Sequence, residues 1–239
     1  MSNAGGGSFD EFEIRNHVLL SLRPSAREFL AKRMMTRRIF PGEVIYEDGA
    51  SFTHAVFPHE GLISLMAEME NGRSVEKTSI GLEGFLGFVL LMGGGNAISR
   101  SVVLLPGYAS WLSVADLDEA LGQFECVRQT MLRYAKALIS HLMESVACNS
   151  LHSAEQRVSR WLLHSHDRVR GDSIAVTQQA VADALGMRRA TVSEVCSQLL
   201  ASGIVEYSRG VLLVLDRPAL ERRSCECYRR IVRNSLAAG

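Results

Sequence analysis

Two short segments near the C-terminal end carry apolar residues at helical spacing, with a glycine between them. In the first segment, Val181, Ala182 and Leu185 share one helix face, and Gly186 follows directly. Glycine readily adopts the left-handed conformation that ends a helix. A second apolar stripe follows, and it consists of Val192, Val195, Cys196 and Leu199. The pattern predicts two helices joined by a tight turn, the second beginning near Arg189.

The spacing changes after Gly203, where apolar and polar residues alternate. This alternation leads into the turn-forming sequence Ser208-Arg209-Gly210, and the apolar run Val211–Leu215 follows. Alternation around a glycine-containing turn predicts a two-stranded hairpin. The whole segment therefore has the pattern of a helix-turn-helix followed by a β wing.

The second of these helices would present a polar face that begins with two arginines. Arg188, Arg189, Thr191, Ser193 and Glu194 fall on that face. Guanidinium groups suit phosphate oxygens and guanine edges, so this face favours a DNA partner. Helix pairs with a glycine turn also occur in proteins that never bind DNA, and the local pattern alone leaves that alternative open.

Residues 38–113 consist of short β-rich runs separated by turn-forming pairs. The pairs are Pro41-Gly42, Asp48-Gly49, Glu60-Gly61, Asn71-Gly72 and Pro106-Gly107. Turns at this interval predict a β-sandwich or roll. The candidate strands are residues 44–46, 55–57, 62–66, 74–78, 102–105 and 108–112.

The segment from about Asp116 to Asn149 has apolar residues three or four apart and no proline. It predicts one helix longer than a small domain needs to cover itself. A core helix and a dimer helix both fit, and we favour the dimer helix because helix-turn-helix proteins that read palindromic sites commonly dimerise. A further helix over residues 153–169 has Ser153 as its N-cap. The predicted dimer stripe is Val127, Met131, Tyr134, Leu138, Leu142 and Val146.

The charge of the chain is distributed unevenly. The chain has 239 residues, a hydrophobic content of 47% and a formal net charge of zero. Residues 1–150 carry 13 basic against 17 acidic residues, a net charge of −4, and residues 151–239 carry 13 against 9, a net charge of +4. All basic residues of the second part are arginine, which favours an anionic partner there, although a solvated basic face would have the same composition.

The chain has no run of eighteen apolar residues and no signal-peptide pattern at its start, so we expect a soluble, cytoplasmic protein without a membrane partner. The cysteines are odd in number and lack paired zinc-finger spacing, which argues against a disulfide framework and a structural zinc. The pair Cys225 and Cys227 is the exception. A thiol sensor or a metal contact is open there, and two semi-buried helix cysteines are favoured.

Particular residues resemble the CRP/FNR family of bacterial transcription regulators, as does the order of β-roll, long helix and winged helix-turn-helix. In the first half these residues are Pro41-Gly42-Glu43, Ile45, Gly49, Gly61, Ile63 and the run Ile80–Gly87. In the second half they are Gln156-Arg157, Trp161-Leu162-Leu163, Thr177-Gln178, Leu185-Gly186 and the run Arg189–Ser193. The closing segments Leu215–Pro218, Leu220-Glu221 and Cys225–Tyr228 resemble one proteobacterial branch of that family.

The resemblance implies an α+β fold in three parts. An N-terminal arm and a jelly-roll-like β-roll sensor domain would occupy residues 1–115, a dimerisation helix residues 116–150, and a winged helix-turn-helix residues 151–239. It also implies a homodimer that binds a two-fold symmetric site on double-stranded DNA, with RNA polymerase as a candidate further partner. A nucleotide- or anion-sensing module that acts through a protein partner is the alternative function.

Cyclic-nucleotide-binding members of the family have a Gly-Glu pair, whose carboxylate accepts the ribose hydroxyl, and a later arginine that meets the phosphate. The matching positions here are Gly87-Phe88 and Arg100. A hydroxyl left unsatisfied against phenylalanine costs about 1–3 kcal/mol, so we expect weak or absent cyclic AMP binding and an unknown effector, if any. Arg100 would then bind another anion or pair with a carboxylate such as Glu83. The candidate ligand-binding residues are Gly81, Glu83, Gly84, Gly87, Phe88, Arg100 and Ser101.

The sequence lacks the ligands that other sensor chemistries of the family need. Iron–sulfur members of the family use cysteines near the N-terminus, whereas the first cysteine here is Cys126. His54 and His59 are isolated, and His164 and His166 point to opposite faces of a predicted helix, so we expect core or solvated histidines and no metal. An enzyme of the β-roll oxygenase or isomerase type would need histidine ligands on strands of residues 38–113. No His-x-His or equivalent ligand set is found there, and we expect no enzyme activity.

The family pattern places base contacts at Arg189, Ala190, Ser193 and Glu194, with the docking geometry borrowed from the catabolite activator of that family. Arg189 and Ser193 fit family precedents. Ala190 replaces a common glutamate, and Glu194 stands where an arginine is frequent. The preferred DNA sequence should therefore differ from the best-known binding sites of the family. The predicted DNA-binding residues are Thr177, Gln178, Arg188, Arg189, Ala190, Thr191, Ser193, Glu194 and Arg209.

Overall fold

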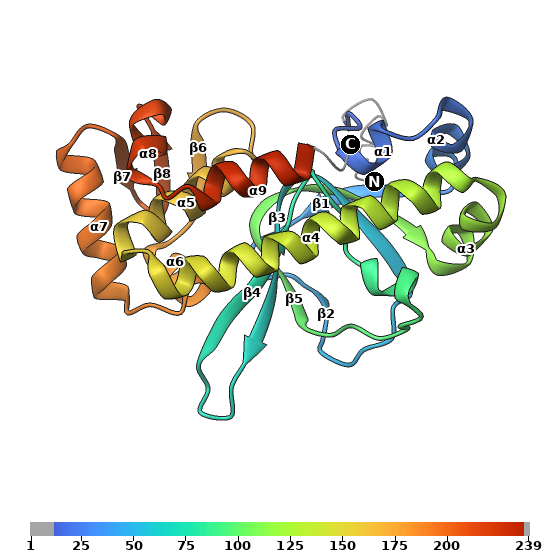
Figure 1. The fold of residues 1–239 in the computed structure, drawn as a ribbon, viewed down its shortest axis with the longest axis horizontal. Coiled ribbons are helices and arrows are strands. Elements are labelled where there is room, and N and C mark those ends of the chain that lie inside the picture. The colour runs from blue at the N-terminus through green and yellow to red at the C-terminus, as the bar shows by residue number, and fades with distance from the viewer. Residues whose placement is uncertain (1–11, 237–239) are drawn as a thin grey trace, which may run out of the picture.

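The computed structural model describes residues 12–236, and its first domain contains a five-stranded antiparallel sheet (Figure 1). Strand order is β1-β5-β3-β4, and β2 also pairs with β5. The predicted mixed α and β architecture is confirmed. The strands are β1 (Met35–Ile39), β2 (Val44–Tyr46), β3 (His54–Glu68), β4 (Ser74–Ile80) and β5 (Arg100–Ser113).

Two predicted turns do not exist, because β3 and β5 are each one long strand. Glu60-Gly61 and Pro106-Gly107 instead lie opposite each other where the β3–β5 ladder shifts register. A Cβ on Gly61 would come within 2.6 Å of the Leu105 carbonyl oxygen, and one on Gly107 within 2.1 Å of the Glu60 carbonyl oxygen. The glycines permit close backbone approach within a ladder, which looks like a turn in the sequence.

The predicted long helix is divided in two. Helix α3 (Val114–Gln123) is capped by Ser113, whose hydroxyl accepts from the Asp116 backbone N–H at 3.1 Å. Helix α4 (Glu125–Leu151) follows after Phe124, which has extended backbone (φ −124°). The Phe124 ring packs on Phe29 with centroids 5.2 Å apart. This aromatic contact holds the break, which the apolar spacing of the sequence did not reveal.

Shorter helices complete the first domain. Helices α1 (His17–Leu20) and α2 (Pro24–Ala31) precede the sheet, and a 3-10 helix, η2 (Phe88–Met92), lies between β4 and β5. Their apolar side chains pack with one face of the sheet and with α3 and α4 around Phe57, Phe85 and Met131, which are fully buried.

The C-terminal domain begins with α5 (Ala154–His166), which ends three residues before the predicted end at Val169. Ser153 and Gln156 form the reciprocal bonds of a capping box, which confirms Ser153 as the N-cap. The remaining elements are β6 (Ser173–Ala175), α6 (Gln178–Leu185), α7 (Arg189–Ala201), β7 (Val205–Ser208), β8 (Val211–Val214), α8 (Arg217–Arg223) and α9 (Cys227–Leu236). Strands β6, β8 and β7 form a small sheet in that order.

The two domains share a packed interface. Leu62 and Leu105 of the first sheet belong to the same buried cluster as the core of the helix-turn-helix. Arg168, which follows α5, donates to both carboxylate oxygens of Glu83, at 2.6 and 3.2 Å, and to the Ser79 hydroxyl at 3.0 Å. Both apolar contact and a buried ion pair therefore join the domains.

Most of the predicted dimer stripe faces inward. Val127, Met131, Tyr134 and Leu138 are buried within the protomer, Leu142 is half-buried and Val146 is 69% exposed. The first four pack on the sheet domain, so the core-helix interpretation is correct for this half of α4. The large exposed apolar residues of α4 are Leu132, Ile139, Met143, Val146 and Leu151.

Candidate nucleic-acid interface

The helix-turn-helix is built from local signals that the sequence carries. Thr177 caps α6 by accepting from the Ala180 backbone N–H at 3.1 Å. Gly186 ends that helix in the left-handed conformation, with φ 63°. Helix α7 starts three residues later, and its inward side chains include Val192 and Leu199, which are at most 1% exposed. The turn and this buried stripe fix which side of α7 faces outward.

The outward side of α7 begins with unpaired cations. Arg188, Arg189 and Ala190 are exposed, and within residues 12–236 neither guanidinium forms a hydrogen bond or an ion pair. Glu194 is exposed one turn later. The other predicted contacts lie on the same motif, with Thr177 exposed and Gln178, Thr191 and Ser193 half-buried.

The wing adds a further exposed cation. Strands β7 and β8 pair from Val205–Val214 to Ser208–Val211, which leaves a two-residue turn of Arg209 and Gly210. Both turn residues have positive φ, 50° and 81°, as a type I′ hairpin requires. Arg209 is exposed at the tip and, in the described part of the chain, has no hydrogen bond or ion pair.

The candidate ligand residues of the sheet domain do not converge on one site. The Arg100 guanidinium binds Glu47 at 3.1 Å and Glu68 at 3.0 Å, and not Glu83 as one alternative had it. Ser101 is buried and donates to the Tyr46 carbonyl oxygen at 3.3 Å. Arg100 is thus occupied by exposed carboxylates.

Phe88 and the nearby glycines have packing roles. Phe88 contacts two apolar clusters of the sheet domain, and Gly87 adopts φ 106° where η2 begins. A Cβ on Gly81 would come within 2.5 Å of the Arg168 side chain, and one on Gly84 within 2.1 Å of the Tyr134 ring. The absence of a Cβ at these two positions lets side chains from α4 and the C-terminal domain approach.

Glu83 lies at the centre of this contact. Burial alone would raise the pKa of Glu83, but the Arg168 guanidinium outweighs burial and holds that pKa below its usual value. The Gly81 backbone N–H also donates to the Glu83 carboxylate at 3.1 Å. The carboxylate that resembled a ligand contact is therefore engaged in docking the two domains.

A cavity of about 340 Å³ lies beside this ion pair, where the sequence predicted none. Its wall includes His17, Tyr134, His141, His164 and Ile231, which come from α1, α4, α5 and α9. Burial lowers the pKa of His141 to about 3 and that of His164 well below its usual value, so both rings are neutral. No motif signals a cavity whose walls are this far apart in the chain.

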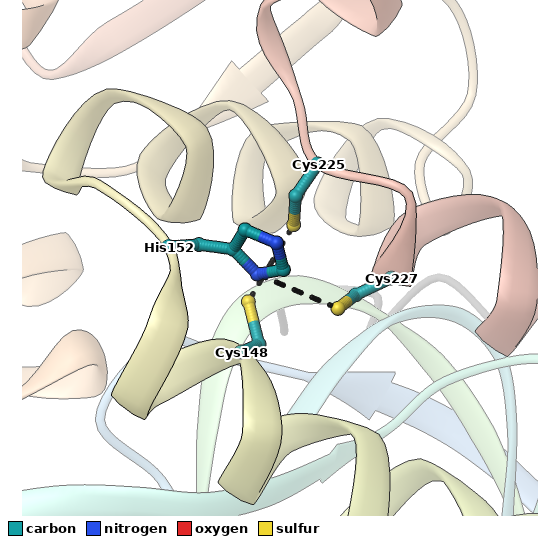
Figure 2. A group of neighbouring side chains, drawn as sticks. All are labelled: Cys148, His152, Cys225 and Cys227. Atoms are coloured by element: carbon teal, nitrogen blue, oxygen red, sulfur yellow. Dashed lines mark hydrogen bonds between the residues drawn. The ribbon is translucent and has the colours of Figure 1, made fainter.

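The structure also differs from the prediction that Cys225 and Cys227 are two semi-buried helix cysteines. Cys225 and Cys227 are 3% and 2% exposed, and Cys225 lies in the link before α9. The fold brings both to Cys148 and to His152, which ends α4 (Figure 2). The sequence could not show this convergence because the two halves of the group are about 75 residues apart.

The fold and the exposed α7 define a winged helix-turn-helix domain attached to an antiparallel sheet domain. Residues 156–223 match the Crp-like helix-turn-helix domain family. Among curated proteins, no sequence matches this chain. Within residues 12–236, no helix is both long and apolar enough to cross a membrane.

Solved structures share this arrangement over most of the chain. FixK2 from Bradyrhizobium japonicum is 18% identical with a TM-score of 0.68, and the match covers 80% of this chain and 98% of that one. A CRP-family transcriptional regulator from Thermus thermophilus is 22% identical with a TM-score of 0.64, over 79% and 96% of the two chains. The regulator CLP from Xanthomonas campestris is 16% identical with a TM-score of 0.59, over 80% and 99%. The chain therefore contains a Crp-like helix-turn-helix domain at residues 156–223 and shares the overall fold of these regulators.

Proposed function

We propose that the protein binds a two-fold symmetric DNA site as a homodimer and regulates transcription there. The observation that carries this proposal is the exposed, unpaired Arg188 and Arg189 at the start of α7, with Arg209 on the adjoining wing. A helix of this kind enters the major groove with its N-terminal residues toward the bases. Two such helices would need to stand about 34 Å apart to meet successive turns of DNA.

The exposed face of α4 supports the dimer. Leu132, Ile139, Met143 and Val146 are 45–69% exposed, and together with Lys136 they follow the alternating four- and three-residue spacing of a coiled-coil seam. A single lysine in such a seam fixes register at some cost in stability. A second copy of α4 would cover these apolar side chains and place the two α7 helices about one axis.

An effector is part of this proposal only in general terms. A ligand shifts the protein between two arrangements by its differential affinity for them and by nothing else. CLP is described as c-di-GMP-responsive, and a solved structure of CprK is of its complex with OCPA, so the fold does not fix the effector. The cavity between the domains supports a small-molecule effector better than Arg100 does, because its wall includes both domains and α4.

Selection of binding sequences from a random DNA pool tests the DNA-reading role. Arg189→Ala should cost about 1–3 kcal/mol and relax preference at one base position of each half-site. Arg209→Ala should weaken binding by a similar factor on every sequence, because a phosphate contact carries no base information. Arg229→Ala, an exposed arginine of α9, is the matched control and should bind as the wild type does. Unchanged base preference in Arg189→Ala would refute the assigned role.

Sedimentation equilibrium tests the dimer. Ile139→Glu places a charge in the apolar seam and should shift the protein to monomer, weakening binding to a two-fold site at least tenfold. Phe40→Glu, an equally exposed apolar position at the edge of the sheet domain, should remain dimeric. A dimer that survives Ile139→Glu would show that another surface forms the interface.

A further inference from the structure

Four metal-binding side chains converge where α4 meets the C-terminal domain (Figure 2). Cys148 lies in the last turn of α4, His152 ends that helix, and Cys225 and Cys227 lie on either side of the start of α9. The Cys148 and Cys225 sulfurs are 3.5 Å apart, and the Cys227 sulfur is 3.6 Å from His152 Nδ1. All four donor atoms lie within 4.8 Å of one another.

These separations suit a tetrahedral ion. Zinc binds thiolate sulfur at about 2.3 Å and imidazole nitrogen at about 2.0–2.1 Å, which sets the edges of the tetrahedron at about 3.5–3.8 Å. The Cys148–Cys225 and Cys227–His152 separations fall at or near that range, and the other donor pairs lie within 4.8 Å. Three cysteines and one histidine are also a complete ligand set for a structural zinc site.

The surroundings of His152 orient it as a ligand. Its Nε2 lies 3.3 Å from a carboxylate oxygen of Glu226, so Nε2–H donates outward and the Nδ1 lone pair faces the sulfurs. A carboxylate behind a histidine is the usual second contact of zinc-bound imidazole. Three thiols can pack together without a histidine that a carboxylate holds in place. Packing alone therefore does not explain this arrangement.

A nearby buried cation fits the charge of the occupied site. Zinc with three thiolates and a neutral imidazole carries a net charge of −1. Arg160 is 6% exposed, and its Nε has no hydrogen-bond partner within the described residues. It interacts electrostatically with Cys148 and Cys225. A net negative zinc site would balance this guanidinium.

A disulfide between Cys148 and Cys225 is the competing use of these thiols. The sulfurs are 3.5 Å apart against about 2.05 Å in a bond. A disulfide would give no role to Cys227 or to the inward lone pair of His152, whereas a zinc ion uses all four groups. The four-residue convergence therefore favours the metal.

We propose that Cys148, His152, Cys225 and Cys227 bind one Zn²⁺ ion, which ties α9 to the end of α4. Binding would release the three thiol protons to solvent. Helix α9 runs antiparallel to α4, with Arg230 3.6 Å from Glu144 and the Asn234 amide donating to Ser140 at 2.7 Å (Figure 1). The ion would lie where α4 ends and α9 begins.

The site also includes the hinge between the domains. His152 and Ser153 are the two residues between α4 and α5, so one zinc ligand is itself a hinge residue. A bound ion would restrict the backbone of the hinge and fix how the DNA-binding domain is oriented on α4. This consequence for DNA rests on the proposed function, whereas zinc binding itself does not.

Metal content of the full-length protein, purified under reducing conditions, tests the site. We expect one zinc per chain, and in the apo protein reconstituted with Co²⁺ we expect a thiolate charge-transfer band with the intense visible bands of tetrahedral cobalt. Cys225→Ser should lose the metal. Cys126→Ser, which alters a cysteine at the far end of α4, is the matched control and should keep it.

Glu226→Gln retains all four ligands, so it distinguishes a loss of zinc affinity from a loss of folding. Its zinc affinity should fall about 10- to 100-fold while the thermal unfolding of its zinc-loaded form stays cooperative. Absence of zinc in the reduced protein, iron in its place, or equal metal loss in Cys126→Ser would overturn the proposal. Removal of zinc should also weaken DNA binding about tenfold. A protein that holds zinc and binds no DNA would instead refute the proposed function and leave the metal site standing.

Discussion

Arginine has opposite surroundings at the domain interface and on the DNA-reading surface. Arg168 is 6% exposed and binds both oxygens of Glu83, whereas Arg188 and Arg189 are exposed and, within residues 12–236, unpaired. A buried guanidinium without a partner would cost several kcal/mol, so Arg168 has to be matched inside the protein. Exposed guanidiniums lose little when unpaired and stay available for an anionic partner. The same residue type therefore docks domains in one region and can recognise DNA in the other.

Removing the interior arginine should have the largest effect. Arg168→Met keeps an apolar stem but leaves the Glu83 carboxylate without its ion pair, and should lower the free energy of unfolding by about 3–5 kcal/mol. Urea denaturation followed by circular dichroism measures this loss. Arg229→Met, at an exposed position, should change stability by less than about 0.5 kcal/mol. A loss under about 1 kcal/mol for Arg168→Met would mean that apolar contact alone docks the domains.

Lowering the pH should destabilise the fold by less than Arg168→Met does, and should leave the DNA-reading surface unchanged. His59 is 1% exposed, and its Nδ1 accepts from the backbone N–H groups of Arg15 and Asn16 at 3.1 and 3.2 Å. Burial, with the nearby Arg15 charge, lowers the pKa of His59 to about 4. Above pH 6.5 the ring is neutral in both states and contributes nothing. As pH falls from about 6.5 toward 4, only the unfolded chain takes the proton, so stability decreases by about 2 kcal/mol by pH 5.

Denaturation at several pH values between 7.5 and 5 measures this dependence. His164, whose pKa burial also lowers, should add to the loss in the same direction. His59→Gln should flatten the slope by up to about 1.4 kcal/mol per pH unit, and His54→Gln is the control. The arginines of α7 and the wing keep their charge over this range, so DNA binding per folded molecule should hold. An unchanged slope in His59→Gln would show that His59 is not the group responsible.

The DNA-binding half could be predicted from the sequence because its signals are local. The cap at Thr177, the glycine that ends α6 and the apolar spacing of α7 each act within a few residues. The two-residue wing turn follows from Arg209 and Gly210 alone. Those signals also located the polar face of α7, although its role toward DNA stays a prediction.

The rest depends on residues that are far apart in the chain. Gly61 and Gly107 were expected in turns because glycine marks both turns and close backbone contacts, and only the pairing of β3 with β5 decides between them. The stripe of α4 was assigned to a dimer because helical spacing shows that a face is apolar but not what covers it. The cavity has no local pattern, and of the cysteine–histidine cluster only the close pair Cys225 and Cys227 stood out in the sequence.

Cyclic AMP should produce the smallest effect, namely none that calorimetry detects. The position that would supply the ribose acceptor is Phe88, which packs in the apolar clusters of the sheet domain. The position that would meet the phosphate, Arg100, already binds Glu47 and Glu68. A phosphate would have to displace these carboxylates and be bound without the ribose contact.

A variant that restores both contacts should gain affinity for cyclic AMP. Phe88→Glu alone restores the acceptor but leaves Arg100 paired, so it should remain insensitive to cyclic AMP. Phe88→Glu combined with Glu47→Gln and Glu68→Gln frees the guanidinium as well, and should show heat of binding where neither change alone does. A dissociation constant in the low micromolar range or tighter for the wild type would contradict the argument. Such affinity would mean that the nucleotide is held elsewhere, and the cavity beside Glu83 and Arg168 would then be the first place to look.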